Sequence, residues 1–84
     1  MSNVVLKSIE AIIHLSNNKL NILKFKYSNI TYDVTELTSY WKEKKGDSII
    51  HHYHLICKKQ NAVCEISINN KDFQCMLVQM DLLE

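Results

Sequence analysis

The sequence predicts an all-β domain, a small antiparallel meander of five to six strands curled into a partly open barrel, with room for one short helix. Apolar and polar residues alternate with period two over residues 23–34, and the alternation returns over residues 50–79. The connections are rich in Asn, Ser and Asp, and the chain contains one Gly and no Pro. With 84 residues, it is long enough for one domain, residues 1–84.

Residues 4–15 fit two patterns. Every second residue from 9 to 15 is apolar, as in a strand, whereas apolar residues three and four apart would also line a helix. The β-branched content and the turn-forming residues 16–19 favour a strand. A strict two-residue loop would set Ile13 opposite Ile22 on the outer face, so we expect a bulge or a longer loop there.

Residues 23–34 predict a hairpin around a two-residue turn at Ser28 and Asn29. The apolar pairs on one face are then Tyr27 with Ile30, Phe25 with Tyr32, and Leu23 with Val34. The polar pairs on the other face are Lys26 with Thr31 and Lys24 with Asp33. This sorting is typical of a half-buried antiparallel hairpin.

After Val34 the alternation fails, because Leu37 and Trp41 lie four residues apart. Either a short helical turn or a bulged strand follows, and both would pack Trp41 against the hairpin as a lid on the core. The polar residues 42–48 contain the one glycine and predict an exposed loop, the segment most prone to disorder.

Residues 50–79 predict three strands joined by turns at Gln60 and Asn61 and at Asn70 and Lys71. The expected apolar pairs are Cys57 with Cys64, Leu55 with Ile66, Tyr53 with Ile68, Ile68 with Phe73, Ile66 with Cys75, and Cys64 with Leu77. All of these side chains share one face, so we expect them to form a common interior with the first hairpin.

The spacing Phe25-x-Tyr27-x-Asn29-x-x-Tyr32-x-Val34-x-x-Leu37-x-x-x-Trp41 resembles a family of small uncharacterised bacterial domains. Asn29 stands where that family has a turn glycine, and Tyr27 and Cys75 stand where it has Trp; the likeness covers roughly residues 20 to 81. It implies an all-β module without assigned catalytic residues. Some members lie beside error-prone DNA polymerase systems, which implies an accessory role near DNA repair.

Charge is nearly balanced, with ten lysines, nine acidic residues and a formal net charge of +1. The absence of arginine counts against sequence-specific base readout and bidentate phosphate contacts. Three cysteines without metal-type spacing indicate a reducing compartment. The start of the chain lacks the pattern of a signal peptide, and no apolar run could cross a bilayer, so we expect a cytoplasmic protein with no membrane contact.

His52 and His54 project from one strand face about 7 Å apart and could share a metal ion. A third ligand would have to come from Glu65 on a diagonal, from His14, or from a second chain. The alternative is a pair of solvated histidines on the sheet surface, and we expect no cofactor.

Cys57, Cys64 and Cys75 all point to the inner face of three consecutive strands. Free cysteine packs as a small apolar residue, so the sequence favours buried side chains in the core. A disulfide between Cys57 and Cys64 under oxidation is the alternative.

Lysines and aromatic residues near one another are typical of modules that bind single-stranded nucleic acid. The candidate residues are Lys24, Lys26, Lys42, Lys44, Lys45, Tyr40 and Trp41. Acidic residues are interleaved with these lysines, which is equally typical of a solvated face of mixed charge.

Apolar residues also fall on the face expected to be wet, and such a strip usually contacts another element, a partner or a second copy of the chain. These interface candidates are Ile22, Ile56, Val63, Met76 and Val78, with Val63 expected opposite Val78 and Met76 opposite Glu65. No phosphate loop, nucleophile elbow or carboxylate pair predicts an enzyme. The sequence therefore favours a non-catalytic interaction or assembly module that self-associates or binds another protein. An accessory nucleic-acid-binding module and a weak metal-binding module are the alternatives.

Overall fold

The computed structural model describes residues 3–17 and 19–83, and these residues form eight strands in two antiparallel sheets. The strands are β1 Asn3–Ser8, β2 Glu10–Ser16, β3 Lys19–Tyr27, β4 Ile30–Asp33, β5 Glu36–Lys45, β6 Ser48–Cys57, β7 Ala62–Asn69 and β8 Cys75–Leu82, with a 3-10 turn η1 at Lys58–Gln60. The larger sheet has the order β1-β8-β7-β6-β5, and the smaller one β2-β3-β4. The prediction of an all-β, partly open architecture is confirmed, with eight strands in place of the expected five to six.

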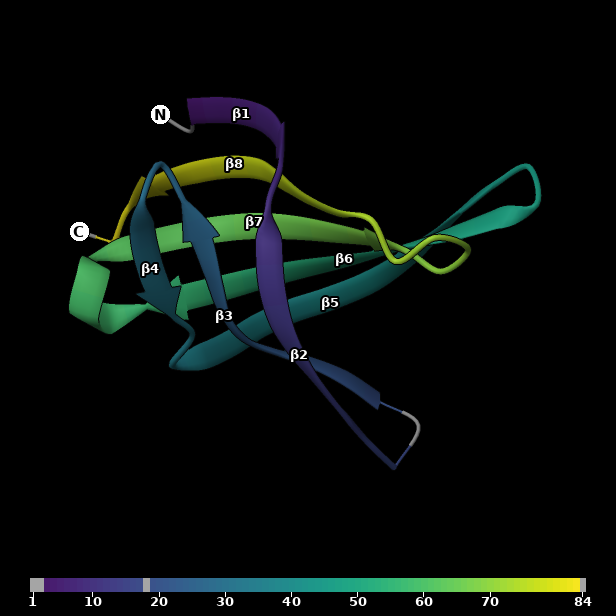
Figure 1. The fold of residues 1–84 in the computed structure, drawn as a ribbon, viewed down its shortest axis with the longest axis horizontal. Helices are drawn as coiled ribbons and strands as arrows, with labels where there is room; N and C mark the ends of the chain where they lie inside the picture. The colour runs from purple at the N-terminus through teal and green to yellow at the C-terminus, as the bar shows by residue number, and fades with distance from the viewer. Residues whose placement is uncertain (1–2, 18, 84) are drawn as a thin grey trace.

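The small sheet lies across one face of the large sheet at a steep angle (Figure 1). The chain passes between the sheets at two corners, at Ile9 and at Val34–Thr35. The Val34 N–H still donates to Leu23 of β3, at 3.0 Å, while the Thr35 N–H already donates to Ile56 of β6, at 2.8 Å. Strands that change sheets through such bends are typical of orthogonal β packing. This corner explains why the alternation fails after Val34.

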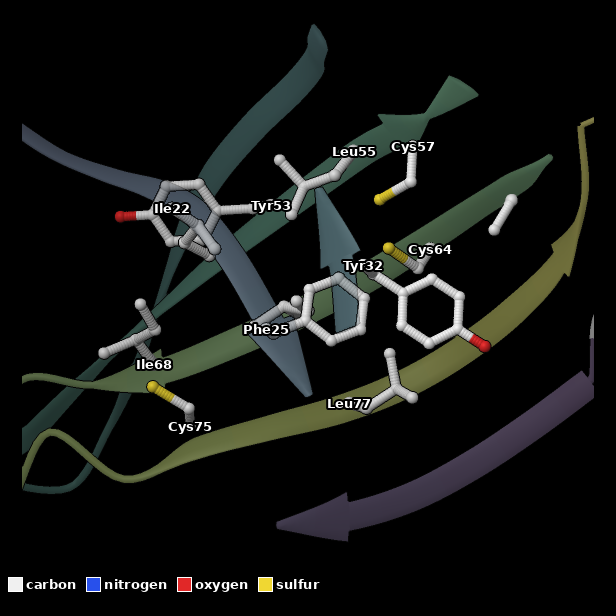
Figure 2. Packing of buried hydrophobic residues seen from close by; sticks show 12 residues of the cluster. Ile22, Phe25, Tyr32, Tyr53, Leu55, Cys57, Cys64, Ile68, Cys75 and Leu77 are labelled. Atoms are coloured by element: carbon white, nitrogen blue, oxygen red, sulfur yellow. The ribbon is translucent and has the colours of Figure 1, made fainter. Parts of the chain in front are cut away.

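The hairpin of β3 and β4 has the predicted register, with Phe25 opposite Tyr32 and Tyr27 opposite Ile30. Ser28 and Asn29 both have positive φ angles, 53° and 63°, as a tight turn of the mirror-image type requires. The rings of Phe25 and Tyr32 stack with centroids 5.0 Å apart. They cover the apolar face of β6, β7 and β8 (Figure 2).

Residues 4–15 form strands, as the sequence favoured, and the expected bulge between β2 and β3 is present. Leu23 is the extra residue, because Ile12 pairs with Lys24 and Ile13 pairs with Ile22. The bulge inverts the order of faces, so Ile22 is 5% exposed and Leu23 is 48% exposed. Leu23 in the interior and Ile22 as an outer-face interface residue were therefore both wrong.

The three strands from β6 to β8 bury the predicted face, but their register differs from the predicted one by two residues. Cys57 pairs with Ala62 rather than Cys64, because η1 and Asn61 make a longer connection than a two-residue turn. Ile68 pairs with Cys75 rather than Phe73, because residues 70–74 all belong to the loop. An even shift leaves the side chains of β6, of β7 and of β8 as far as Leu77 on their predicted faces, but it moves Phe73 out of the strand, and Phe73 is 61% exposed.

Residues 42–48 were expected to be an exposed, disorder-prone loop, and this was wrong. Residues 42–45 continue β5, and Gly46 and Asp47 alone make the turn into β6. Gly46 has a φ angle of +56°, which only a residue tolerant of left-handed backbone can adopt at low cost. None of the described residues form a helix long and apolar enough to cross a membrane.

Candidate functional site

Strand β5 is the last strand of the large sheet, and all ten of its residues are exposed. Within residues 3–17 and 19–83 it pairs with β6 alone. An edge strand leaves every second residue with its N–H and C=O directed away from the sheet. β5 is therefore a long, uncovered row of peptide donors and acceptors.

A bulge at Thr38 sets which side chains of β5 face each way. Leu37 pairs with Leu55 and Ser39 with His54, so Thr38 is the extra residue, and its hydroxyl donates to the His54 carbonyl at 3.2 Å. The bulge was one of the two expected alternatives after Val34. It directs Leu37 and Tyr40 toward the small sheet and Trp41 to the opposite face, so Trp41 as a core lid was wrong.

Trp41 instead packs on the histidines of β6, on the outer face of the large sheet. Its ring stacks on His52 with centroids 5.1 Å apart and an interplanar angle of 6°. It also meets His54 edge to face, with centroids 4.8 Å apart. Trp41 remains 39% exposed. Trp41 on the edge strand therefore forms one aromatic surface with His52 and His54 on the outer face of the large sheet.

Two glutamates complete this cluster. His54 Nε2 lies 2.9 Å from Glu65 Oε1, and His52 Nε2 lies 3.0 Å from Glu43 Oε1. Glu65 was expected on a diagonal, but the two-residue shift in register places it directly opposite His54. His52 Nδ1 lies 3.3 Å from Glu65 Oε2 but makes no hydrogen bond to any described residue, and it is buried.

The Nε2 atoms of His52 and His54 are thus already held by carboxylates. Over residues 3–17 and 19–83, no group of three or more His, Cys, Asp or Glu side chains could hold a metal ion. The predicted metal site at His52 and His54 has no third ligand in place there.

The face of β5 that looks toward the small sheet borders a pocket of about 350 Å³. Its lining residues are Lys19, Leu20, Asn21, Leu37, Tyr40, His51 and Tyr53. Tyr40 Oη and His51 Nδ1 share a hydrogen bond of 2.6 Å, and the Tyr40 ring packs on Tyr53 with centroids 5.1 Å apart. The three rings give the pocket aromatic walls.

Burial controls the charge of these rings. It lowers the pKa of His51, and the neighbouring Lys42 and His52 lower it further. It raises the pKa of Tyr53 to about 12, with Tyr40 contributing. Both side chains are therefore neutral near pH 7, and the nearby charge is positive.

The structure divides the predicted nucleic-acid residues. Lys42, Lys44 and Lys45 lie together at the end of β5, but Tyr40 and Trp41 lie on its opposite faces. Lys24 and Lys26 belong to β3 in the small sheet, where they pair with Asp33 and Thr31. Only the β5 lysines lie beside the predicted aromatic residues.

The predicted apolar strip is interrupted. Ile56 pairs with Val63 on the outer face, but Val63 pairs next with Asp81 rather than Val78. Met76 pairs with Ser67 rather than Glu65, and Val78 is the extra residue of a bulge in β8. What remains of the strip is the cross-strand pair of Ile56 and Val63.

All three cysteines are buried and free, as predicted. The Cys64 thiol donates to Cys57, and this hydrogen bond, together with burial, raises the pKa of Cys64. Burial also raises the pKa of Cys75. The raised pKa values make Cys64 and Cys75 poor nucleophiles, whereas the hydrogen bond from Cys64 lowers the pKa of Cys57.

No family model matches the chain, and no curated protein or solved structure is significantly similar to it. The resemblance to small bacterial domains therefore stays a prediction.

The pocket is the feature that reasoning from the sequence missed. The sequence pattern placed Tyr53 in the core but indicated no pocket beside Tyr53 and His51, because the residues that face them come from β3 and β5. Glu43 was likewise assigned to a loop. The only local signal was the aromatic and histidine content of residues 51–54.

Proposed function

We propose that this chain is a non-catalytic assembly module that self-associates through the edge strand β5. The observation that carries the proposal is the ten-residue edge, every residue of which is exposed. Strand addition to such an edge forms main-chain hydrogen bonds along its length, and a symmetric dimer uses the same edge twice. The three lysines at one end discourage registers that set them against their own copies.

Charge disfavours the registers centred on residues 42 to 45 and permits those centred on Trp41 or Tyr40. A two-fold pairing keeps each face of the sheet continuous, so residues directly opposite must share a face. Pairing centred on Trp41 sets Ser39 opposite Glu43 of the second copy and Tyr40 opposite Lys42, with no like charges facing. Pairing centred on Lys42 or Glu43 would set each of those charges against its own copy, which is destabilising.

Two substitutions at Ser39 test both the edge and the register. In the Trp41-centred dimer, residue 39 of each copy faces Glu43 of the other. Ser39→Glu therefore creates two repulsive carboxylate pairs, whereas Ser39→Lys creates two attractive pairs. We expect Ser39→Glu to raise the dimer dissociation constant about twofold to thirtyfold and Ser39→Lys to leave it equal or lower. Sedimentation equilibrium measures both, and thermal unfolding of the dilute protein checks that neither damages the monomer.

Val63→Asp is the control for the alternative interface, because Val63 lies on the outer face away from the edge. If Val63→Asp dissociates the dimer and the Ser39 variants do not change its dissociation constant, the interface lies on the outer face and not at the edge. A monomer at every concentration would refute self-association.

The second candidate function is accessory binding of nucleic acid, favoured by Lys42, Lys44 and Lys45 beside Tyr40 on one strand. This candidate predicts that the chain shifts labelled single-stranded DNA at low salt and that affinity falls as salt rises. Lys44→Gln with Lys45→Gln should weaken binding and flatten the salt dependence, while Lys24→Gln with Lys26→Gln should not. Gel-shift titrations at two salt concentrations measure this, and equal losses from both pairs would contradict it.

A further inference from the structure

Tyr53 lines the pocket between β3, β5 and β6, and its hydroxyl opens onto it. The Tyr53 residue is 3% exposed, and its hydroxyl makes no hydrogen bond to any part of the chain that the structure describes. Its oxygen points away from the packed side chains of Phe25 and Leu77 (Figure 2). Because it opens onto the pocket, this hydroxyl has no partner from the described part of the protein. A ligand in the pocket would supply one.

The walls and size of the pocket restrict that ligand. A volume of about 350 Å³ lies at the lower end of the range for small-molecule sites. Tyr40 is 45% exposed, stacks on His51 with centroids 5.9 Å apart, and packs on the Tyr53 ring. Flat rings stack well on such aromatic side chains. The geometry therefore suits a planar ring that carries a hydrogen-bond acceptor.

Charge around the pocket selects an anion. Lys19 lines the pocket. Lys42 on β5 is the cross-strand partner of His51, and its charge lowers the pKa of His51. Among the described residues that line it, none carries a carboxylate. The Asn21 side chain adds an amide at the rim.

We propose that this pocket binds a nucleotide, with the base stacked on Tyr40, a base acceptor bonded to the Tyr53 hydroxyl, and the phosphate near Lys19 and Lys42. The nucleotide is either free or part of a single strand. The site does not depend on self-association through β5. If the chain does not bind single-stranded nucleic acid, the proposal still holds for free nucleotides.

NMR titration of the ¹⁵N-labelled protein tests the site with AMP, UMP, adenosine and inorganic phosphate. We expect AMP or UMP at millimolar concentration to shift the amide signals of Tyr40, His51 and Tyr53, with weaker binding of adenosine and little effect of phosphate alone. The absence of any shift from both nucleotides would overturn the proposal. So would equal binding of AMP and adenosine, since the phosphate would then contribute nothing.

Removal of one hydroxyl provides a matched pair of variants. Tyr53→Phe should weaken nucleotide binding about fivefold to tenfold, the usual effect of one hydrogen bond. Tyr32→Phe removes a hydroxyl from another buried tyrosine outside the pocket and should leave affinity unchanged. Equal affinities of the two variants would refute the role of Tyr53. Tyr40→Leu retains a large apolar side chain at an exposed position and should also weaken binding.

A labelled oligothymidylate separates the two sources of nucleotide. Binding more than tenfold tighter than that of a mononucleotide, and sensitive to Tyr53→Phe, supports a site for single strands. Comparable affinities support a site for free nucleotides. If neither Tyr53→Phe nor Tyr40→Leu changes the affinity for the oligonucleotide, this pocket is not its binding site. The second candidate function would then still hold at another surface.

Discussion

Trp41 and Glu65 illustrate how neighbours decide the role of a residue. Each is unremarkable by type, since a lone Trp usually lies in a core and a Glu on a surface. In the fold, Trp41 stacks on His52, while Glu65 is bonded to His54 and also accepts from Gln79 Nε2 at 3.3 Å. The histidines were predicted on the outer face from the sequence. Their partners required the register of β5, β6 and β7.

The lowered pKa of His51 implies that the stability of the protein depends on pH. Its pKa is lowered by burial, then by Lys42 and His52, so the folded state binds a proton more weakly than the unfolded state. The stability it contributes is complete above its ordinary value near 6.5 and is lost as pH falls through the lowered folded pKa. We expect His51→Gln to reduce this acid loss. Urea unfolding of both proteins at pH 7.5 and at pH 5 measures the difference.

Lys42→Gln provides the control, because it removes one cause of the lowered pKa and keeps the imidazole. It should show a smaller acid loss than the wild type. Parallel pH profiles for the wild type and His51→Gln would contradict the assignment to His51.

At the scale of single strands, bulges account for the main differences between the predicted and observed directions of side chains. A bulge adds one residue to a strand and reverses the inward and outward order beyond it. Leu23 in β3 and Thr38 in β5 are such residues, and they account for buried Ile22 and outward Trp41. The pattern hinted at both, since the alternation conflicted at Ile22 and failed after Val34. It could not place the extra residue, because the opposing strand decides where a bulge fits.

The turn between β5 and β6 gives a prediction at this scale. Gly46 has a φ angle of +56°, and an added Cβ would meet nothing within 4 Å. Gly46→Ala should therefore destabilise the protein by about 1 kcal/mol through backbone strain alone. Gly46→Asn should cost less, because Asn tolerates this conformation. Urea unfolding tests the order, and a loss at Asn as large as that at Ala would contradict it.

The whole molecule consists of two sheets that share one core, with Phe25 and Tyr32 on one side and Leu55, Ile66 and Leu77 on the other. The strand that ends a sheet, and the pocket where the sheets diverge, are properties of this arrangement. Neither follows from any one segment. The proposed assembly edge and nucleotide pocket both depend on β5, which the sequence assigned in part to a loop.

The sequence by itself determined the architecture and most of the interior. Period-two alternation is local, and a shift of two residues in β6, β7 and β8 left Leu55, Ile66 and Ile68 on the buried face. The tertiary structure decided register, bulges, sheet order and the neighbours of Trp41, Tyr53 and Glu65. These depend on pairing between distant segments and on the length of their connections, and the free energy of such pairing is not written in the pattern of either segment alone.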